Sequence, residues 1–223
     1  MIIQFCYSHF GNSDLRSLGP RKSPIQARSA ATVDAIFEAT IQVLLSHGLS
    51  ALTTTRIAKR AGVSIGTLYQ YFPNKDALLR AVITSYLGKV AASFEESCSA
   101  ARGACLLEIS EFIVRGYIFA KCDQPERSRA LYAISSHLEV ADVVEKVFAR
   151  LRAAACRLLE SCKDASFKNA DEVAYSLLAA LTGGTRVVFE NRDAEGRLPA
   201  FTQQMLTMSQ AFLNKSASQN ATI

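Results

Sequence analysis

The 223-residue chain lacks tryptophan, has only three histidines, and contains six cysteines that form no C-x-x-C pair. Without such a pair, or a histidine at ligand spacing from a cysteine, we expect no metal site. No run of about eighteen apolar residues is present, which argues against a membrane-spanning helix. Residues 1–10 lack the basic start and long apolar core of a signal peptide, so we expect a cytoplasmic protein without membrane contact.

Signatures of catalysis are also scarce. We find no H-E-x-x-H motif and no phosphate-cradling glycine loop, and the histidines His9, His47 and His137 are far apart. We therefore predict that the chain is not an enzyme and needs no cofactor. The cysteines are interpreted as small apolar side chains on helices, with a thiol redox sensor as the alternative.

Charge is unevenly distributed along the chain. Residues 1–82 carry nine Lys or Arg and four Asp or Glu, whereas residues 83–223 carry sixteen of each. The whole net charge of +5 therefore lies in the front segment. A basic head on a neutral body suits a polyanion such as DNA, because phosphate neutralisation supplies most non-specific affinity. A merely solvated basic surface is the alternative.

The segment from residue 53 to residue 75 predicts two short helices joined by a tight turn. Thr53 can cap the first helix, and Gly62 supplies the left-handed residue that ends it after Ala61. Ser64 caps the second helix. Its apolar positions, four residues apart, form one buried stripe beneath an exposed face. The stripe consists of Leu68 and Phe72, and the exposed face holds Ile65, Gly66, Thr67, Tyr69 and Gln70.

That exposed face has the chemistry of a helix that enters a DNA groove. Small residues at Gly66 and Thr67 allow close approach to base edges, while Tyr69, Tyr71 and Lys75 can reach phosphate oxygens. The alternative for any single residue is an ordinary core aromatic or surface lysine. The ordered combination of cap, glycine turn and small exposed face favours DNA recognition.

The sequence Ala61-Gly-Val-Ser64, followed by Gly66-Thr-Leu-Tyr-Gln-Tyr-Phe72, Lys75 and Leu78, resembles the tetracycline-repressor (TetR) family. The motif covers about residues 30–82, and the rest of the chain resembles the family by layout. The resemblance implies an all-α protein with an N-terminal three-helix helix-turn-helix DNA-binding domain, followed by a helical ligand-binding and dimerisation domain. The residues implied to bind DNA are Thr54, Thr55, Ile65, Gly66, Thr67, Tyr69, Gln70, Tyr71 and Lys75.

Where this family often has a polar residue, the chain has Ile65, which favours contact with a thymine methyl group over a hydrogen bond. We divide the chain into a disordered basic extension (1–25), a helix-turn-helix domain (26–74) and an effector-binding and dimerisation domain (75–223). Apolar residues at helical spacing predict further helices, and no alternating pattern predicts a strand. The expected helices cover residues 29–47, 75–90, 106–120, 126–136, 139–161, 170–191 and 198–215.

The last two helices carry an apolar stripe that we expect to pair with a second copy of the chain. By resemblance, these helices form a four-helix bundle across a two-fold axis. The alternative is that both helices bury these faces within one protomer. The predicted interface residues are Leu177, Leu181, Gly184, Val188, Phe201, Met205, Met208 and Phe212.

Aromatic and polar-tipped side chains spread over the body are candidates for an effector pocket, with plain core residues as the alternative. Low charge in these helices favours an apolar or aromatic small-molecule effector of unknown identity. The candidates are Phe112, Tyr117, Tyr132, His137, Tyr175 and Phe189. The sequence thus predicts a homodimeric transcriptional repressor, released from double-stranded operator DNA by its effector. A helical small-molecule-binding or interaction protein without DNA binding is the alternative.

Overall fold

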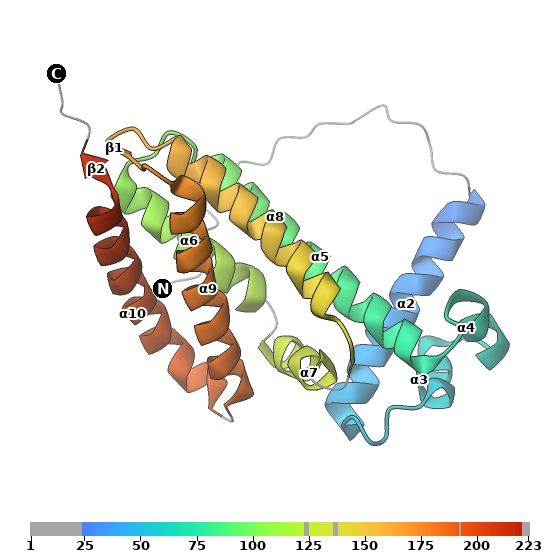
Figure 1. Cartoon of the computed structure of the whole chain (residues 1–223). Helices are drawn as coiled ribbons and strands as arrows, with labels where there is room; N and C mark the ends of the chain where they lie inside the picture. The colour runs from blue at the N-terminus through green and yellow to red at the C-terminus, as the bar shows by residue number, and fades with distance from the viewer. Residues whose placement is uncertain (1–23, 123–124, 136–137, 192, 220–223) are drawn as a thin grey trace.

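The computed structural model describes residues 24–122, 125–135, 138–191 and 193–219, so most of the predicted extension 1–25 lies outside the described residues. Figure 1 shows a small head at one end and a larger helical body at the other. The head contains helices α2 (Pro24–His47), α3 (Thr54–Ala61) and α4 (Ile65–Tyr71). Helix α5 (Lys75–Ala100) runs from the head along the body.

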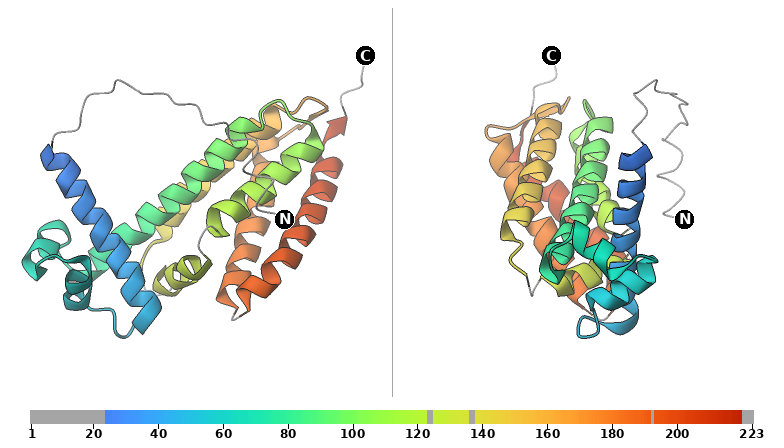
Figure 2. Two further views of the ribbon diagram at one scale, coloured as in Figure 1. Left: turned by 180° about the vertical axis from the view of Figure 1, so that it is seen from behind. Right: turned by 90° about the vertical axis from the view of Figure 1, so that its right-hand side faces the viewer.

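The body is built from five further helices: α6 (Leu106–Cys122), α7 (Pro125–Ser135), α8 (Ala141–Glu160), α9 (Ala170–Glu190) and α10 (Ala194–Ser216). Helix α5 packs against α6 and α8, and α10 packs against α6 and α9. In both views of Figure 2, α9 and α10 lie side by side. The predicted all-α fold is confirmed, with α10 starting four residues earlier than expected.

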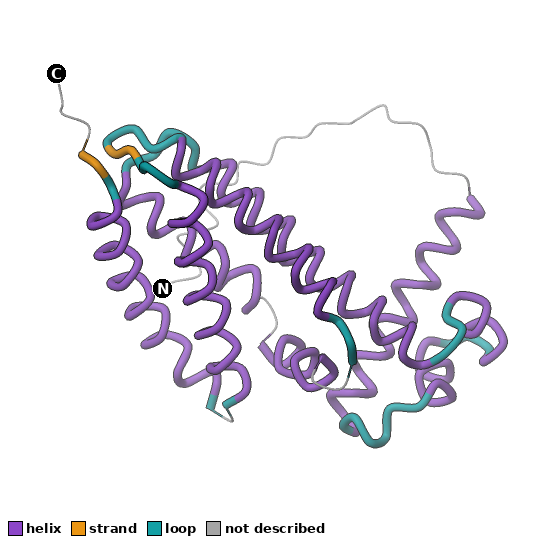
Figure 3. The backbone as a smooth tube through the Cα atoms, viewed as in Figure 1, coloured by secondary structure: helices purple, strands orange, loops and turns teal. Residues whose placement is uncertain are grey.

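Two short strands are the exception to the helical fold. Strand β1 (Ala165–Ser166) pairs antiparallel with β2 (Ser218–Gln219), and Ala165 lies opposite Gln219. Figure 3 shows this pair joining the α8–α9 connection to the end of α10. The sequence analysis predicted no strand, because a two-residue segment is too short to show alternation.

The head does not have a core of its own. Its buried residues Ile36, Ile57 and Leu68 share one apolar cluster with residues of α5, α7 and α8. The contributions from outside the predicted helix-turn-helix domain are Leu78, Leu79, Val82, Ile83, Leu131, Ile134, Val140 and Val143. Helix α5 thus begins at the predicted domain boundary between residues 74 and 75, and because its first turns pack into the head, no break in packing occurs there.

By length and composition alone, α5 is also apolar enough to cross a membrane, in contrast to the sequence expectation. Its apolar residues are nevertheless accounted for by packing within this chain. Leu78 and Phe94 are fully buried, and Val82 and Val90 are nearly so. Contacts with α6 and α8 cover this side of the helix, so α5 has the surroundings of a core helix.

Candidate nucleic-acid interface

Helix α3 begins and ends where local chemistry requires. The Thr53 hydroxyl accepts a hydrogen bond from the Arg56 N–H at 3.3 Å, which satisfies a free donor of the first turn. At the other end, Gly62 adopts φ 69° and its N–H donates to the Lys59 carbonyl at 3.3 Å. A side chain in this left-handed conformation costs roughly 1–2 kcal/mol, which explains the glycine. The predicted bounds of this helix are therefore the observed ones.

Contacts at both ends of helix α4 and on its buried side fix its position. The Ser64 hydroxyl accepts from the Thr67 N–H at 2.9 Å, and Leu68 is fully buried. Phe72, directly after the helix, is 8% exposed and packs against Phe37 with ring centroids 5.8 Å apart. These contacts leave the opposite side of α4 facing solvent.

The exposed side of α4 matches the predicted face. Ile65 is 41% exposed and Tyr69 is 47% exposed, which is unusual for large apolar side chains. Gly66 and Gln70 are exposed beside them, and Thr67 is partly exposed. Side chains of this size on one side of a short helix suit insertion into a major groove.

A hydrogen bond ties the start of α3 to this face. The hydroxyls of Thr54 and Tyr69 lie 3.1 Å apart, so two of the predicted DNA-binding residues contact each other. Thr55 is exposed at the start of α3, and Lys75 is partly exposed at the start of α5. Tyr71 instead turns partly inward, with its ring 6.4 Å from that of Phe72.

Cations on α3 were not among the predicted site residues, although they are exposed on the helix that precedes α4. Arg56, Lys59 and Arg60 are all exposed. Arg60 Nε donates to the Gln42 amide oxygen at 2.7 Å, which orients its guanidinium beside α2. The excess of basic residues in the front segment was the available signal for them, since a charge count identifies a surface but not individual contacts.

The stretch from Gly62 to Gly66 also matches the pattern G-x-S-x-G of serine hydrolases. That pattern requires a serine on a sharp turn between a strand and a helix. Here Ser64 follows helix α3, and its hydroxyl is used as the cap of α4 and contacts the Thr67 hydroxyl at 2.8 Å. The serine has a structural role at this position.

The described members of the predicted effector set differ in their surroundings. Phe112 and Tyr175 are exposed, whereas Tyr117 is buried with its ring edge toward Phe94. Tyr132 and Phe189 do meet, with stacked rings whose centroids are 6.3 Å apart. His137 lies outside the described residues. A cavity of about 480 Å³ at the junction of head and body is lined by none of these candidates, but by Asn74, Asp76, Ala77, Arg80, Leu138 and Glu139.

Several predicted dimer residues belong instead to the core of the chain itself. Leu177, Leu181 and Met205 are at most 4% exposed and form part of the body's apolar cluster. Val188 is also buried, and a Cβ atom on Gly184 would lie 2.8 Å from the Phe201 ring. Met208 and Phe212 remain exposed, at 56% and 37%. Helical periodicity identified an apolar side correctly, but four of the eight predicted interface residues are buried within the protomer.

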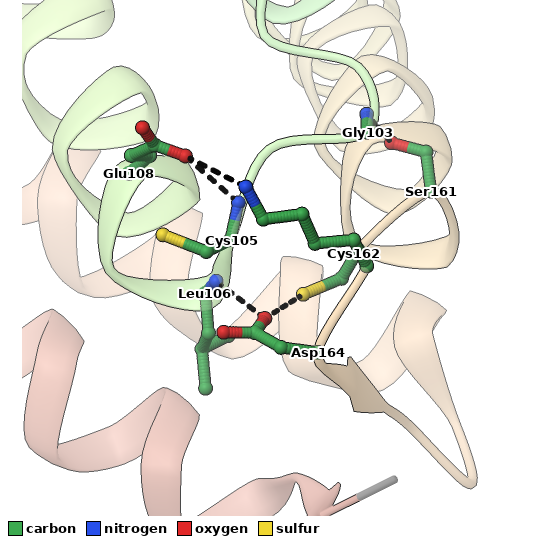
Figure 4. Close-up of polar contacts among 8 residues, drawn as sticks. Gly103, Cys105, Leu106, Glu108, Ser161, Cys162 and Asp164 are labelled. Atoms are coloured by element: carbon green, nitrogen blue, oxygen red, sulfur yellow. Dashed lines mark hydrogen bonds and ion pairs between the residues drawn. The ribbon is translucent and has the colours of Figure 1, made fainter. Parts of the chain in front are cut away.

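Polar contacts at the far end of the body join the α5–α6 and α8–α9 connections (Figure 4). Asp164 accepts from the Leu106 N–H at 2.8 Å and from the Cys162 thiol at 3.2 Å, and Glu108 accepts from the Cys105 N–H at 2.9 Å. The hydrogen bond from Cys162 is the main cause of the lowered pKa of Asp164. These contacts cap the start of α6.

Three of the described thiols, Cys98, Cys156 and Cys162, give no support to the redox-sensor alternative. Burial raises the pKa of Cys98 to about 12, and burial is also the main cause of the raised pKa values of Cys156 and Cys162. A raised pKa lowers the fraction of reactive thiolate. Among the described residues, no group of three His, Cys, Asp or Glu side chains is placed to hold a metal ion.

A capped helix, a left-handed glycine turn and a second helix with its outer face exposed define a helix-turn-helix protein. The family model for bacterial regulatory proteins of the tetR family matches residues 36–82, and the model for the tetracyclin repressor-like C-terminal domain matches residues 106–213. The two models together span most of the chain, and the chain belongs to the TetR family, a family of transcriptional regulators.

Curated relatives match only part of the chain. An uncharacterized HTH-type transcriptional regulator of Haemophilus influenzae is 36% identical over 66 residues, which are 28% of this chain and 35% of that protein. The HTH-type transcriptional repressor KstR of Mycobacterium tuberculosis is 30% identical over 117 residues, 50% of this chain and 52% of that protein. The chain thus spans about a third to a half of the length of these curated relatives.

The fold as a whole resembles a solved regulator. The crystal structure of a TetR transcription regulator from Haloarcula marismortui matches with a TM-score of 0.66. The match covers 85% of this chain and all of that chain, at 19% identity. This likeness concerns the fold, and the individual roles of side chains follow from their positions in this chain.

Proposed function

We propose that the chain is a transcriptional repressor of the cytoplasm that binds double-stranded operator DNA as a homodimer and is released by a small-molecule effector. The observation that carries the proposal is the outer face of α4, with Ile65, Tyr69 and Gln70 exposed on a helix fixed by its cap and by Leu68. The cations Lys59 and Arg60 beside it supply sequence-independent attraction to phosphates.

The dimer would form through the outward faces of α9 and α10. On α9, Ala179, Ala180 and Gly183 are exposed and small, so a second helix can approach closely, and Val187 beside them is 68% exposed. On α10 the exposed apolar residues are Met208 and Phe212. The same two helices from a second copy, related by two-fold symmetry, would cover both faces and complete a four-helix bundle.

The effector site would lie at the contact between α7 and α9, where Tyr132 stacks on Phe189. The ammonium group of Lys121 lies 4.6 Å from the Tyr132 ring centroid, so this contact includes a buried cation among aromatic rings. On its other side, α7 is joined to the head, because Arg127 forms an ion pair with Glu38 of α2 at 2.8 Å. An apolar or aromatic effector that separates the two rings would displace α7 and, through it, the head.

The test is a titration of the full chain against duplex DNA from upstream of its own gene, repeated at rising salt concentration. The proposal expects the logarithm of the association constant to fall linearly and steeply with the logarithm of salt concentration. Tyr69→Ala should weaken this binding, because it removes an exposed side chain of α4, and should leave the dimer intact. If the chain binds no duplex even at low salt, the alternative holds, which is a helical protein that binds ligands or partners and does not bind DNA.

A further inference from the structure

The outer face of α4 restricts which bases the chain can recognise, an inference that depends on the proposed binding to DNA. Helix α4 has the sequence Ile-Gly-Thr-Leu-Tyr-Gln-Tyr and contains no lysine, arginine, aspartate or glutamate. The commonest specific contact with guanine is made by arginine or lysine to O6 and N7, and cytosine is read by carboxylates. Neither contact is available from this helix.

Most polar groups on the face are already used within the chain. The Thr67 hydroxyl contacts Ser64 at 2.8 Å, and the Tyr69 hydroxyl contacts Thr54 at 3.1 Å. Gln70 is exposed, and its amide makes no hydrogen bond to any described residue. Its carboxamide is therefore free to bind adenine bidentately, accepting from N6 and donating to N7.

At the other edge of the face, Ile65 presents an apolar side chain that is 41% exposed at the first position of the helix. The C5-methyl group of thymine is the apolar feature of the major groove. Gly66, next to Ile65, has no side chain, and the nearest atom to a Cβ placed there would be Ser64 Oγ at 3.7 Å. The backbone can therefore approach the groove floor closely beside Ile65.

We infer that α4 selects an A·T-rich half-site in which Gln70 reads an adenine and Ile65 packs on the methyl group of a thymine. The two residues are five positions apart, about 7.5 Å along the helix axis and about 140° around it, so they lie at different edges of the exposed face and contact different base pairs. The cations of α3 and Lys75 contact phosphates and do not contribute to this selection.

The experiment selects duplexes from a random pool with the full-length chain, then modifies single atoms of the recovered half-site. Replacing each thymine by uracil removes one methyl group, and replacing each adenine by 7-deazaadenine removes one N7 acceptor. Dissociation constants are measured for the wild type, Ile65→Ala and Gln70→Ala. Leu107→Ala serves as the matched control, because Leu107 is an exposed apolar residue on α6, at 56%, and circular dichroism checks that each variant is folded.

We expect one uracil to weaken the wild type about fourfold, the value of one buried methyl group, and to have no effect on Ile65→Ala. One 7-deazaadenine should weaken binding of the duplex by the wild type and leave binding by Gln70→Ala unchanged. The Gln70→Ala change itself should lower the discrimination between adenine and the other bases at that position by about 5- to 150-fold. Leu107→Ala should respond to both modified bases as the wild type does.

Two outcomes overturn the inference while the proposed function stands. One is a recovered half-site in which G·C pairs carry the selectivity. The other is that every uracil and every 7-deazaadenine weakens the variants as much as the wild type. If the chain retains no duplex even at low salt, the proposed function fails, and the inference fails with it. The inference is supported if binding depends on the methyl group of one thymine only when Ile65 is present, and on N7 of one adenine only when Gln70 is present.

Discussion

Lys75 is a single charge at the start of α5, separated from the end of α4 at Tyr71 by the three residues Phe72 to Asn74, and we assign it to a phosphate. We expect Lys75→Ala to weaken binding to all duplexes by a similar factor, because a phosphate contact is independent of sequence. The slope of log K against log salt should become shallower by about 1. Titrations at four salt concentrations, with a specific and a scrambled duplex, measure both effects. A change confined to the specific duplex would contradict the assigned role.

Glu95 provides a pH-dependent contribution to stability. Its carboxylate accepts two hydrogen bonds from Arg150, at 2.9 and 2.7 Å, and this is the main cause of its lowered pKa. A carboxylate whose pKa is lower in the folded state stabilises the fold above the ordinary glutamate pKa. That contribution is lost as the pH falls through the lowered value. Because both side chains are partly exposed, we expect at most about 1 kcal/mol.

Arg150→Ala should therefore reduce the free energy of unfolding at pH 7 and change it little at pH 3. Denaturant titrations at both pH values measure the difference. Arg115→Ala, at an exposed arginine of α6, is the control. An equal loss at both pH values would show that Arg150 acts by packing instead of by its charge.

At the scale of elements, two adjacent glycines of α9 should respond in opposite ways to alanine. A Cβ atom on Gly183 meets nothing within 4 Å, whereas one on Gly184 lies 2.8 Å from the Phe201 ring. Gly183→Ala should stabilise the protomer by up to about 1 kcal/mol through helix propensity. Gly184→Ala should be less stable than Gly183→Ala by about 1–3 kcal/mol, because the ring must move.

Urea unfolding of both variants at low protein concentration measures these stabilities. Sedimentation at higher concentration then tests the proposed dimer face, where the added methyl group of Gly183→Ala should weaken association. A variant Gly184→Ala as stable as Gly183→Ala would mean that the Phe201 ring has room to shift.

The elements that could be predicted from sequence are those with local signals. Helix α3 was predicted residue by residue, because Thr53 and Gly62 determine its ends through contacts within a few residues. The element against which the apolar side of a helix packs comes from a distant part of the chain, so no local sequence pattern predicts it. The periodicity of Leu177 and Leu181 therefore could not distinguish the protomer core from a dimer interface. The same limit applies to the predicted effector residues. Among the described ones, Tyr132 and Phe189 stack on each other, whereas Tyr117 and Tyr175 pair with Phe94 and Phe148.

At the scale of the whole molecule, the head depends on the body for its core. Ile134 of α7 is fully buried in the cluster that also holds Ile57 and Leu68. Ile134→Ala should cost about 2–5 kcal/mol through the cavity it leaves. It should also lower the hydrogen-exchange protection of α3 and weaken DNA binding, although Ile134 lies outside the helix-turn-helix.

Ile109→Ala is the matched comparison, because Ile109 is equally buried but belongs to the body cluster. Exchange measured by mass spectrometry should show a larger loss of α3 protection for Ile134→Ala than for Ile109→Ala. Equal losses would indicate that the two clusters unfold as one unit.

Helix α5 is continuous over 26 residues, so a small movement in the body produces a larger movement of the head. At 1.5 Å per residue it is about 39 Å long, so a tilt of about 5° about its far end moves its tip by about 3.4 Å, one base-pair step. A tilt of the whole helix produces this displacement without a hinge. In the proposed dimer, a tilt of a few degrees in each α5 would therefore carry the two heads out of register with successive major grooves.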